Sequence, residues 1–305
     1  MASTGITKAL KALSKRWGRT LLYRLTILMG SLTLTGCTSL SALFFYPQST
    51  LISTPQDAGL EYQDVWLTAQ DNTKLHAWWL PAQGKQADSN IMLLYLHGNA
   101  ENISSHSHSI YWLPASGINV LALDYRGFGA SEGQARMPEV LQDIEAAILW
   151  MKQQHPDKEL IILGQSIGSA IAINYIAQAA DQHDIKALIL DAPLSGFATA
   201  ARSAMSRSII GWLMWPFTVL IPSQWDPIKH IQSIDMPVLI MHSPKDTIVP
   251  AQQGKKLYAH WHKAHPEQQL CWLDSKGPHI MSFAFPELRQ ATLSFIKNRQ
   301  CPKLK

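Results

Sequence analysis

The stretch that decides the fold is Leu160-Ile161-Ile162-Leu163-Gly164-Gln165-Ser166-Ile167-Gly168-Ser169-Ala170-Ile171. Branched apolar residues lead into a serine that has one glycine two positions before it and another two positions after it. This G-x-S-x-G pattern predicts a strand, a sharp turn and a helix, with the serine at the turn in a strained backbone conformation. The glycines are needed where a Cβ would clash between strand and helix. A glycine-flanked serine in an ordinary strand-to-helix turn is the alternative.

Elsewhere in the 305 residues, short continuous apolar runs alternate with helical stretches. Strands that are apolar on both faces and joined by helices indicate a parallel sheet covered on both sides. Two alternating runs, 62–69 and 75–80, are separated by Asp71-Asn72 and predict an antiparallel hairpin at the edge of that sheet. We therefore expect one α/β domain with a mostly parallel, eight-stranded sheet. The continuous runs are 91–96, 120–123, 160–163, 187–190, 238–241 and 270–273, and the helical stretches lie near 103–114, 138–153, 167–180, 250–262 and 286–298.

The first 36 residues differ from the rest of the chain. They carry six basic residues and no acidic one, and residues 25–36 form an uncharged, mostly apolar run that is short for a bilayer span. The run ends in Leu34-Thr35-Gly36-Cys37, which resembles the lipobox of bacterial lipoproteins, in which the cysteine is lipidated and becomes the first mature residue. This resemblance implies a signal peptide over 1–36 and lipidation of Cys37. An uncleaved signal anchor is the alternative.

Lipidation would attach the protein to a membrane of the bacterial cell envelope, facing the periplasm. Thr38 stands where aspartate is associated with retention in the inner membrane, which favours the outer membrane.

Without the first 36 residues, the chain has 20 basic and 22 acidic residues. No excess of basic residues therefore remains to bind a nucleic-acid partner. Cys271 and Cys301 could pair in an oxidising compartment, and a buried free Cys271 is equally compatible with the sequence.

Functional side chains in a parallel sheet gather at the carboxyl ends of its strands. Ser166 follows one apolar run, Asp246 follows the next-to-last and His279 follows the last. The chain order Ser, Asp, His is that of a triad in which histidine takes the serine proton and aspartate orients the histidine. Asp191 comes one strand too early, and Asp274 is too near His279 in sequence to approach it easily. Asp246 is therefore the predicted acid.

The run 91–96 ends in His97-Gly98-Asn99. Its glycine allows close backbone approach, so the backbone amides of Asn99 and Ile167 are predicted to converge as an oxyanion hole. We expect His97 to hydrogen-bond its own loop rather than to take part in catalysis.

The glycine-rich loop 124–133 follows the next strand. It is predicted to buttress the loop after His97, with Asp124 and Arg126 available as an internal ion pair.

Residues 194–225 follow the sixth strand of the predicted sheet, and 209–222 contain more apolar side chains than a connecting loop needs. We interpret this segment as a cap that lines an acyl or aromatic pocket or lies against lipid. The alternative is a pair of short helices that pack on the domain without contacting substrate.

No cofactor and no metal are expected. Histidines at positions 106 and 108, and at 260, 262 and 265, could suggest metal ligands. Alternate spacing on a helix directs neighbours to different faces, so a solvated face is the better interpretation.

Four motifs together, the segment 97–102, the loop 124–133, the Gly164–Gly168 turn and the segment 245–250, resemble the α/β-hydrolase family and, within it, the Bem46-like branch of membrane-associated serine hydrolases. The likeness runs from about Tyr62 to the last helix. It implies Ser166 as nucleophile, Asp246 and His279 as its partners, and the amides of Asn99 and Ile167 as oxyanion donors. Pro278 departs from the glycine that relatives commonly have before the histidine, and it stiffens that loop. The division expected is a signal peptide, 1–36, a lipidated tether, 37–60, and a hydrolase domain, 61–300, with a cap at 194–225.

The expected activity is hydrolysis of a small acyl ester or thioester through an acyl-enzyme intermediate. A peptidase or amidase of the same fold is the alternative enzyme, although peptidases usually bring a large extra domain. A non-catalytic binding lipoprotein is the alternative from another class, and it would have no need of all three triad residues. Haloalkane dehalogenases and epoxide hydrolases are disfavoured because they place an aspartate where Ser166 stands.

Overall fold

A computed structural model describes residues 40–84, 90–179, 184–206, 208–267 and 270–302. Residues 41–305 form a compact unit of their own. The predicted signal peptide and Cys37 lie outside the described residues.

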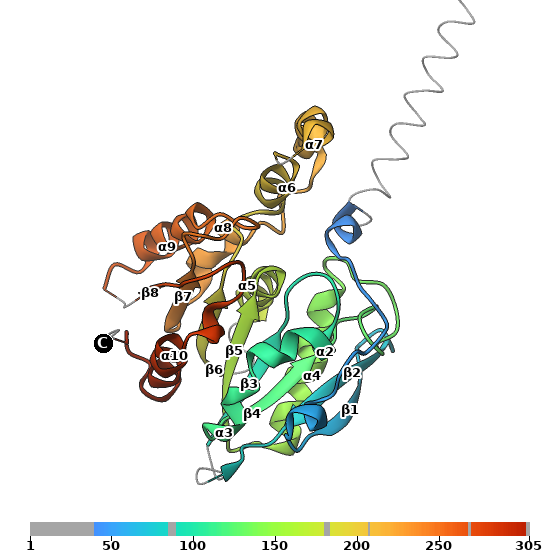
Figure 1. Cartoon of the computed structure of the whole chain (residues 1–305), viewed down its shortest axis with the longest axis vertical. Helices are drawn as coiled ribbons and strands as arrows, with labels where there is room; N and C mark the ends of the chain where they lie inside the picture. Colours follow the sequence, from blue (N-terminus) through green and yellow to red (C-terminus); the bar gives the residue numbers. More distant parts are fainter. Residues whose placement is uncertain (1–39, 85–89, 180–183, 207, 268–269, 303–305) are drawn as a thin grey trace, which may run out of the picture. The chain divides into compact units, whose positions relative to one another are not determined.

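The described part of the chain forms one eight-stranded sheet with the strand order β1-β2-β4-β3-β5-β6-β7-β8 (Figure 1). β1 pairs antiparallel with β2, β2 pairs antiparallel with β4, and the remaining pairs are parallel. The predicted fold class and edge hairpin are therefore confirmed. The strands are β1 (Gln63–Thr68), β2 (Lys74–Leu80), β3 (Ile91–Leu96), β4 (Asn119–Leu123), β5 (Glu159–Gln165), β6 (Ile185–Asp191), β7 (Val238–His242) and β8 (Leu270–Asp274).

Successive residues of the central strands face opposite sides of the sheet, which creates two separate cores. On β3, Leu94 and Leu96 belong to one apolar cluster, whereas Leu93 and Tyr95 belong to the other. Helices α4 (Val140–Gln154), α5 (Ile167–Ala179) and α9 (Gln252–Ala264) cover the first cluster. Helix α10 (Pro286–Asn298) and the helical segments after β3 cover the second. Both faces of the sheet are thus closed to water, as the unbroken apolar runs predict.

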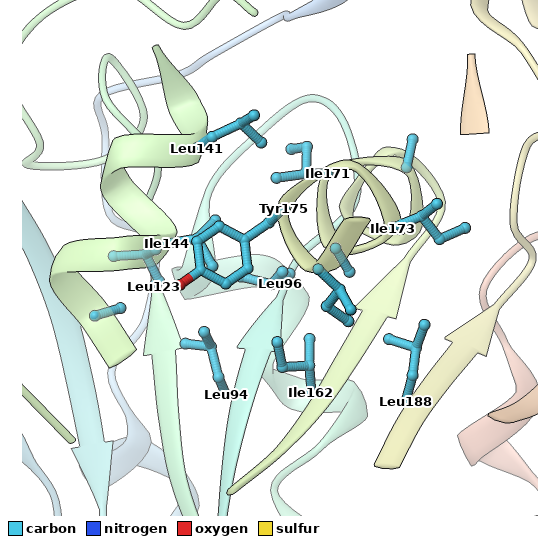
Figure 2. Packing of buried hydrophobic residues seen from close by; sticks show 14 of the residues in the cluster. Leu94, Leu96, Leu123, Leu141, Ile144, Ile162, Ile171, Ile173, Tyr175 and Leu188 are labelled. Atoms are coloured by element: carbon cyan, nitrogen blue, oxygen red, sulfur yellow. The ribbon is translucent and has the colours of Figure 1, made fainter. Parts of the chain in front are cut away.

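Figure 2 shows the first core at close range. Leu94 on β3, Ile162 on β5 and Leu188 on β6 point up from the sheet, and Ile144 of α4 and Tyr175 of α5 point down onto them. The aliphatic side chains here are fully buried. Because this packing fixes α5 on the sheet, it also fixes the turn that leads from β5 into α5.

The segment after β3 is not one helix over 103–114, as the sequence predicts. It is divided into α2 (Ile103–His106), the 3₁₀ turn η4 (Ser107–Ser109) and α3 (Trp112–Ala115). The hydroxyls of Ser105 and Ser109 donate to the carbonyls of Asn102 and His106 at 3.0 and 2.9 Å. Such side-chain bonds compete with the regular helical pattern.

The segment expected as a cap, 194–225, contains α6 (Phe197–Met205), α7 (Ile209–Met214) and the 3₁₀ turn η5 (Trp215–Leu220). The connection back to β7 runs through α8 (Pro227–His230) and η6 (Ile231–Ser233). The other short turns are η1 (Leu40–Phe44), η2 (Pro55–Ala58) and η7 (Ser282–Ala284). Among the described residues, no helix combines the length and the apolar character needed to span a membrane.

Candidate active site

Ser166, His279 and Asp246 meet at the carboxyl edge of the sheet, although they lie 113 and 33 residues apart in sequence. The Ser166 hydroxyl lies 2.8 Å from Nε2 of His279, and Nδ1 of His279 lies 2.6 Å from Oδ2 of Asp246. When Nδ1 carries the hydrogen and donates it to Asp246, Nε2 is free to accept the proton of Ser166. The arrangement can therefore deprotonate a serine hydroxyl.

The turn that carries Ser166 is strained and tightly packed. Ser166 has a φ of 54°, which is rare for a residue with a Cβ. A Cβ on Gly164 would lie 2.7 Å from the backbone of Gly168, and a Cβ on Gly168 would lie 2.1 Å from the carbonyl oxygen of Leu96. Both glycines are thus required by the close approach of β5, α5 and the end of β3, as the G-x-S-x-G pattern predicts.

The carboxylate of Asp246 is fully buried and held from several sides. Its Oδ1 accepts the backbone amides of Ile248 and Val249 at 2.8 and 2.9 Å. Burial by itself raises the pKa of Asp246, but bonds from His242, His279 and the Val249 amide favour the charged form more strongly. Together they hold its pKa well below the ordinary value, so that Asp246 faces His279 as a carboxylate.

His242, at the end of β7, is a partner of Asp246 that the sequence analysis did not identify. Its Nε2 lies 2.8 Å from the carbonyl oxygen of Val249 and 3.4 Å from Oδ2 of Asp246. A carbonyl oxygen only accepts, so Nε2 carries the hydrogen and shares it between the two oxygens. The sequence indicates this role of His242 only by its position at the end of a strand, four residues before Asp246.

The backbone around the predicted oxyanion donors is close-packed. Ile167 is the first residue of α5, and a Cβ on Gly168 would also lie 2.7 Å from the carbonyl oxygen of His97. The first turn of α5 therefore touches the segment that leads to Asn99. The Asn99 side chain holds this loop in place, because its Nδ2 donates to the carbonyl of Phe44 at 2.7 Å and its Oδ1 accepts the amide of Tyr46 at 3.0 Å.

Asp124 supports the loop after β3, as expected of the loop 124–133. Its Oδ1 accepts the amide of Ile103 at 2.8 Å and lies 3.4 Å from Nε2 of His97. His97 is fully buried, and its Nδ1 lies 2.7 Å from the carbonyl oxygen of Gly98. His97 thus shapes its own loop, as predicted.

The predicted ion pair between Asp124 and Arg126 is wrong. Arg126 instead binds Asp143 of α4 and Asp71 of the hairpin turn, each with a shortest distance of 2.7 Å. The reason is tertiary packing, which brings Asp143 of α4 and Asp71 of the β1–β2 turn to Arg126. The carboxylate of Asp124 is instead bonded to the amide of Ile103. Arg126 therefore ties the loop to the hairpin and to α4.

Another buried carboxylate, Asp191 at the end of β6, joins the serine turn to the histidine loop. Its backbone carbonyl accepts the amide of Ser166 at 2.9 Å, and its Oδ2 accepts Nε2 of Gln165 at 2.9 Å. Its Oδ1 accepts the hydroxyl of Ser282, three residues after His279, at 2.5 Å. Burial raises the pKa of Asp191, and the bonds from Ser282 and Gln165 work in the opposite direction. The sequence suggests Asp191 only as a competing triad acid and gives no sign of this network.

The remaining acidic and histidine candidates lie elsewhere. Asp274 is exposed and its Oδ1 accepts the indole of Trp272 at 3.0 Å. His106 stacks on His97 with the ring centres 5.4 Å apart, whereas His108 is exposed. Within the described ranges, no group of three or more His, Cys, Asp or Glu residues could hold a metal ion.

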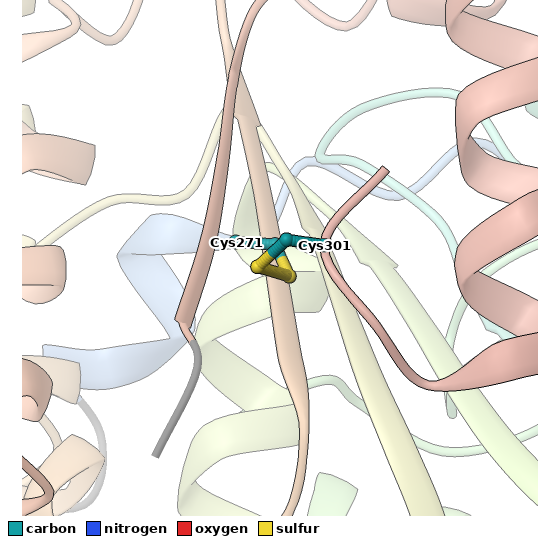
Figure 3. The surroundings of a disulfide bond; sticks show 2 residues. All are labelled: Cys271 and Cys301. Carbon is teal, nitrogen blue, oxygen red and sulfur yellow. A yellow bond between two sulfur atoms is a disulfide. The ribbon is translucent and has the colours of Figure 1, made fainter. Parts of the chain in front are cut away.

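Cys271 and Cys301 form a disulfide, with their Cα atoms 5.0 Å apart (Figure 3). The bond joins the start of β8 to the segment that follows α10. The pairing is one of the two alternatives that the sequence left open.

A hollow of about 600 Å³ lies between the end of β1, α4 and α5. Thr68, Leu141, Glu145 and Tyr175 are among its lining residues, and none of the three triad residues borders it. We therefore do not place the reacting group of a substrate there.

The chain is similar to several known proteins. A family model described as "Serine aminopeptidase, S33" (Hydrolase_4) matches residues 87–226. The "Uncharacterized protein YfhR" of Salmonella typhi is 31% identical over 271 residues, which cover 83% of this chain and 87% of that protein. The "Lysophosphatidylserine lipase ABHD12" of Danio rerio is 31% identical over 232 residues, which cover 68% of this chain and 61% of that protein.

The solved structure of the esterase Pf2001 from Pyrococcus furiosus superposes with a TM-score of 0.68 at 25% identity, covering 84% of this chain and 98% of that one. Sheet order and superposition therefore agree on one fold. The chain has the α/β-hydrolase fold and belongs to the same family as the YfhR proteins.

Proposed function

We propose that this protein is a serine hydrolase that cleaves an ester or thioester of a hydrophobic acyl group while anchored to a membrane through Cys37. The observation that carries the chemical part is the position of the His279 imidazole, 2.8 Å from the Ser166 hydroxyl and 2.6 Å from the Asp246 carboxylate. Two similar proteins, an esterase and a lysophosphatidylserine lipase, support ester hydrolysis.

The reaction follows from this geometry. Nε2 of His279 takes the proton of Ser166 as Oγ attacks the substrate carbonyl carbon, and the resulting oxyanion is stabilised by the amides of Asn99 and Ile167. His279 then gives the proton to the departing oxygen or sulfur, and the acyl group remains on Ser166. Water, deprotonated by His279, attacks the acyl-serine and releases the acid.

Asp246 keeps the imidazole in the productive tautomer throughout. Its low pKa ensures that it is a carboxylate whenever His279 becomes an imidazolium. The two charges then stabilise each other in a buried setting, where electrostatic interactions are stronger than in water.

The test of the chemistry uses Ser166→Ala in the full chain. The variant should lose labelling by a fluorophosphonate probe and hydrolysis of short p-nitrophenyl esters by at least about 10³-fold. Thermal melting would verify that the variant is folded. Full activity of the variant would refute the proposal, and absence of probe labelling in the folded parent would favour a non-catalytic binding protein.

A peptidase is the second candidate, because the matching family model is described as a serine aminopeptidase. Parallel assays on p-nitroanilides of amino acids and on p-nitrophenyl esters separate the two candidates. We expect the ester to have the higher kcat/KM, and a preference for the anilide would favour the peptidase.

The anchoring part of the proposal rests on the sequence of residues 1–37 and is supported by the Cys271–Cys301 disulfide, since disulfides persist in oxidising compartments such as the periplasm. Cys37→Ser should abolish lipid labelling and release the protein from membranes. Retention of the variant in the membrane fraction without lipid would instead indicate an uncleaved anchor.

A further inference from the structure

An unusually apolar surface is formed by residues 209–220 of α7 and η5, called here the cap surface. The sequence of this stretch contains no charged residue. Eight of its apolar side chains are exposed to 45% or more: Ile209, Ile210, Trp212, Leu213, Trp215, Phe217, Val219 and Leu220. Exposed large apolar patches on a protein surface mark interaction sites.

The exposed apolar side chains of the cap surface are not confined to one stripe. Ile209, Ile210, Trp212 and Leu213 span more than a full helical turn, and each is at least 66% exposed. Thr218, at 1% exposure, is buried instead, where its hydroxyl accepts Nε of Arg202 at 2.7 Å. A helical segment that is apolar all round belongs in a protein core or in lipid.

The chain enters the folded domain beside this surface. Phe44 packs on Phe197 of α6 with ring centres 5.0 Å apart, and α6 packs against both α7 and η5. Phe45 is 6% exposed, whereas its neighbours on the same segment, Leu43 and Tyr46, are 66% and 64% exposed. The entry segment therefore is fixed at the base of the cap and adds apolar surface there.

The same entry segment is bonded to the catalytic edge. The Asn99 side chain forms hydrogen bonds with the carbonyl of Phe44 and the amide of Tyr46. In addition, the amide of Gln48 donates to the carbonyl of Glu101 at 3.2 Å. The loop that bears the predicted oxyanion donor is thus held by the residues through which the chain enters the domain.

We propose that the cap surface inserts into the apolar layer of the phospholipid bilayer to which the chain is anchored, and that the triad takes its acyl substrate from that bilayer. The docking rests on the anchoring proposed above. Cys37 precedes Ser41 by four residues, which reach at most about 14 Å when extended. A lipid on Cys37 brings the bilayer within this reach of the entry segment, and an uncleaved apolar run that ends at residue 36 lies one residue farther away.

The chemistry of the cap surface fits lipid better than a second copy of the chain. A protein partner would cover one side of α7 and leave the others exposed, whereas lipid covers them all. Trp212 and Trp215 also suit the border between acyl chains and headgroups, where tryptophan is enriched.

The experiment places a photoreactive side chain on the cap of the full-length protein. Trp212→p-benzoylphenylalanine is compared with Trp66→p-benzoylphenylalanine, because Trp66 on β1 is similarly exposed, at 60% against 72%. Each variant is reconstituted into vesicles of phosphatidylethanolamine and phosphatidylglycerol containing a trace of radiolabelled phosphatidylethanolamine, floated on a gradient and irradiated. We expect about tenfold more radiolabelled lipid adduct at position 212 than at position 66.

The other outcomes overturn the docking. Cross-linking of position 212 to a second copy would identify an interface between copies, and cross-linking to residues 1–39 would identify a contact within the chain. Equal lipid labelling at positions 212 and 66, or none at 212 in floated protein, would also refute it. Failure of the parent protein to float would refute the anchoring and the docking together. Flotation and cross-linking do not depend on catalytic activity.

The source of the substrate is tested by the double variant Trp212→Ser, Leu213→Ser. We expect the ratio of its activity on a long-chain ester embedded in the same vesicles to its activity on a soluble butyrate ester to fall about tenfold relative to the parent. An unchanged ratio would refute the membrane route to the triad even if the lipid adduct forms.

Discussion

Ser282 donates a hydrogen bond of 2.5 Å to the buried carboxylate of Asp191, and this bond connects the loop of His279 to the strand next to the Ser166 turn. The side chains of Ser282, in the histidine loop, and of Gln165, directly before Ser166, thus bond to the same carboxylate. Pro278 and the Ser282 bond bracket His279 on both sides, so the loop has little freedom to withdraw the imidazole.

Ser282→Ala should lower kcat about fivefold to tenfold and leave KM within about twofold, because one hydrogen bond worth about 1 kcal/mol no longer positions His279. Steady-state kinetics on a soluble ester measures this split. Ser282→Thr keeps the hydroxyl and should restore most of kcat. A fall in melting temperature with kcat unchanged would instead show that the bond only stabilises the fold.

Asp246→Asn should lower kcat by roughly 10³- to 10⁴-fold, because an amide no longer favours the imidazole tautomer with Nε2 free and does not stabilise the imidazolium. The rate of fluorophosphonate labelling should fall with it. Asp274→Asn is the matched control, since Asp274 is an exposed aspartate at the neighbouring strand end and should have almost no effect. Comparable losses in the two variants would argue against the role given to Asp246.

Gly168→Ala should destabilise the protein by about 3 kcal/mol or more, because the new Cβ would lie 2.1 Å from the carbonyl oxygen of Leu96 and must force α5 away from β3. Gly59→Ala is the control. Gly59 has a φ of 74° with no atom within 4 Å of the added Cβ, so only about 1 kcal/mol of backbone strain is expected. Urea unfolding of both variants measures the difference, and equal losses would contradict the close-packing argument.

Reduction of the Cys271–Cys301 disulfide should lower the free energy of unfolding by about 3 to 4 kcal/mol, the loop-closure value for a separation of 30 residues. Guanidinium unfolding with and without a phosphine reductant provides the measurement. A Cys271→Ala, Cys301→Ala double variant should be insensitive to reductant. If the reductant affects parent and double variant equally, the disulfide does not stabilise the fold.

Stability should fall between neutral pH and pH 4 in a manner that depends on His106. Burial, and then the nearby His97, lower the pKa of His106 from 6.5 to about 4. The unfolded chain therefore binds a proton first as the pH falls, so the contribution of His106 is complete above pH 6.5 and is lost as the pH approaches 4. This contribution is at most about 3 kcal/mol.

His106→Gln removes the titrating group and retains a side chain able to donate to the carbonyl of Ala100. The difference in unfolding free energy between parent and variant should shrink as the pH falls from 7.5 to 4. Urea unfolding at several pH values measures it, and a difference that is independent of pH would contradict the assignment.

Strand positions and the Ser166 turn follow from local sequence. Residues 91–96 and 160–163 are apolar at every position because both faces of their strands are covered. Glycine is the only residue that the close contact at positions 164 and 168 tolerates. The order of Ser166, Asp246 and His279 along the chain predicted which residues would meet, because strand ends in a parallel sheet share one edge.

The partners of buried charges do not follow from local sequence. Arg126 bonds to Asp71 and Asp143 and not to its near neighbour Asp124, and Asp191 acts through Ser282 and Gln165, because these contacts depend on how the hairpin, α4 and the histidine loop pack. The pairing of Cys271 with Cys301 and the exposure of the cap surface are likewise long-range outcomes. Apolar periodicity and the positions of glycines reflect the local conformation of each segment, so they can be interpreted from the sequence. Ion pairs, hydrogen bonds and the disulfide between distant segments form only when the tertiary structure brings those segments together.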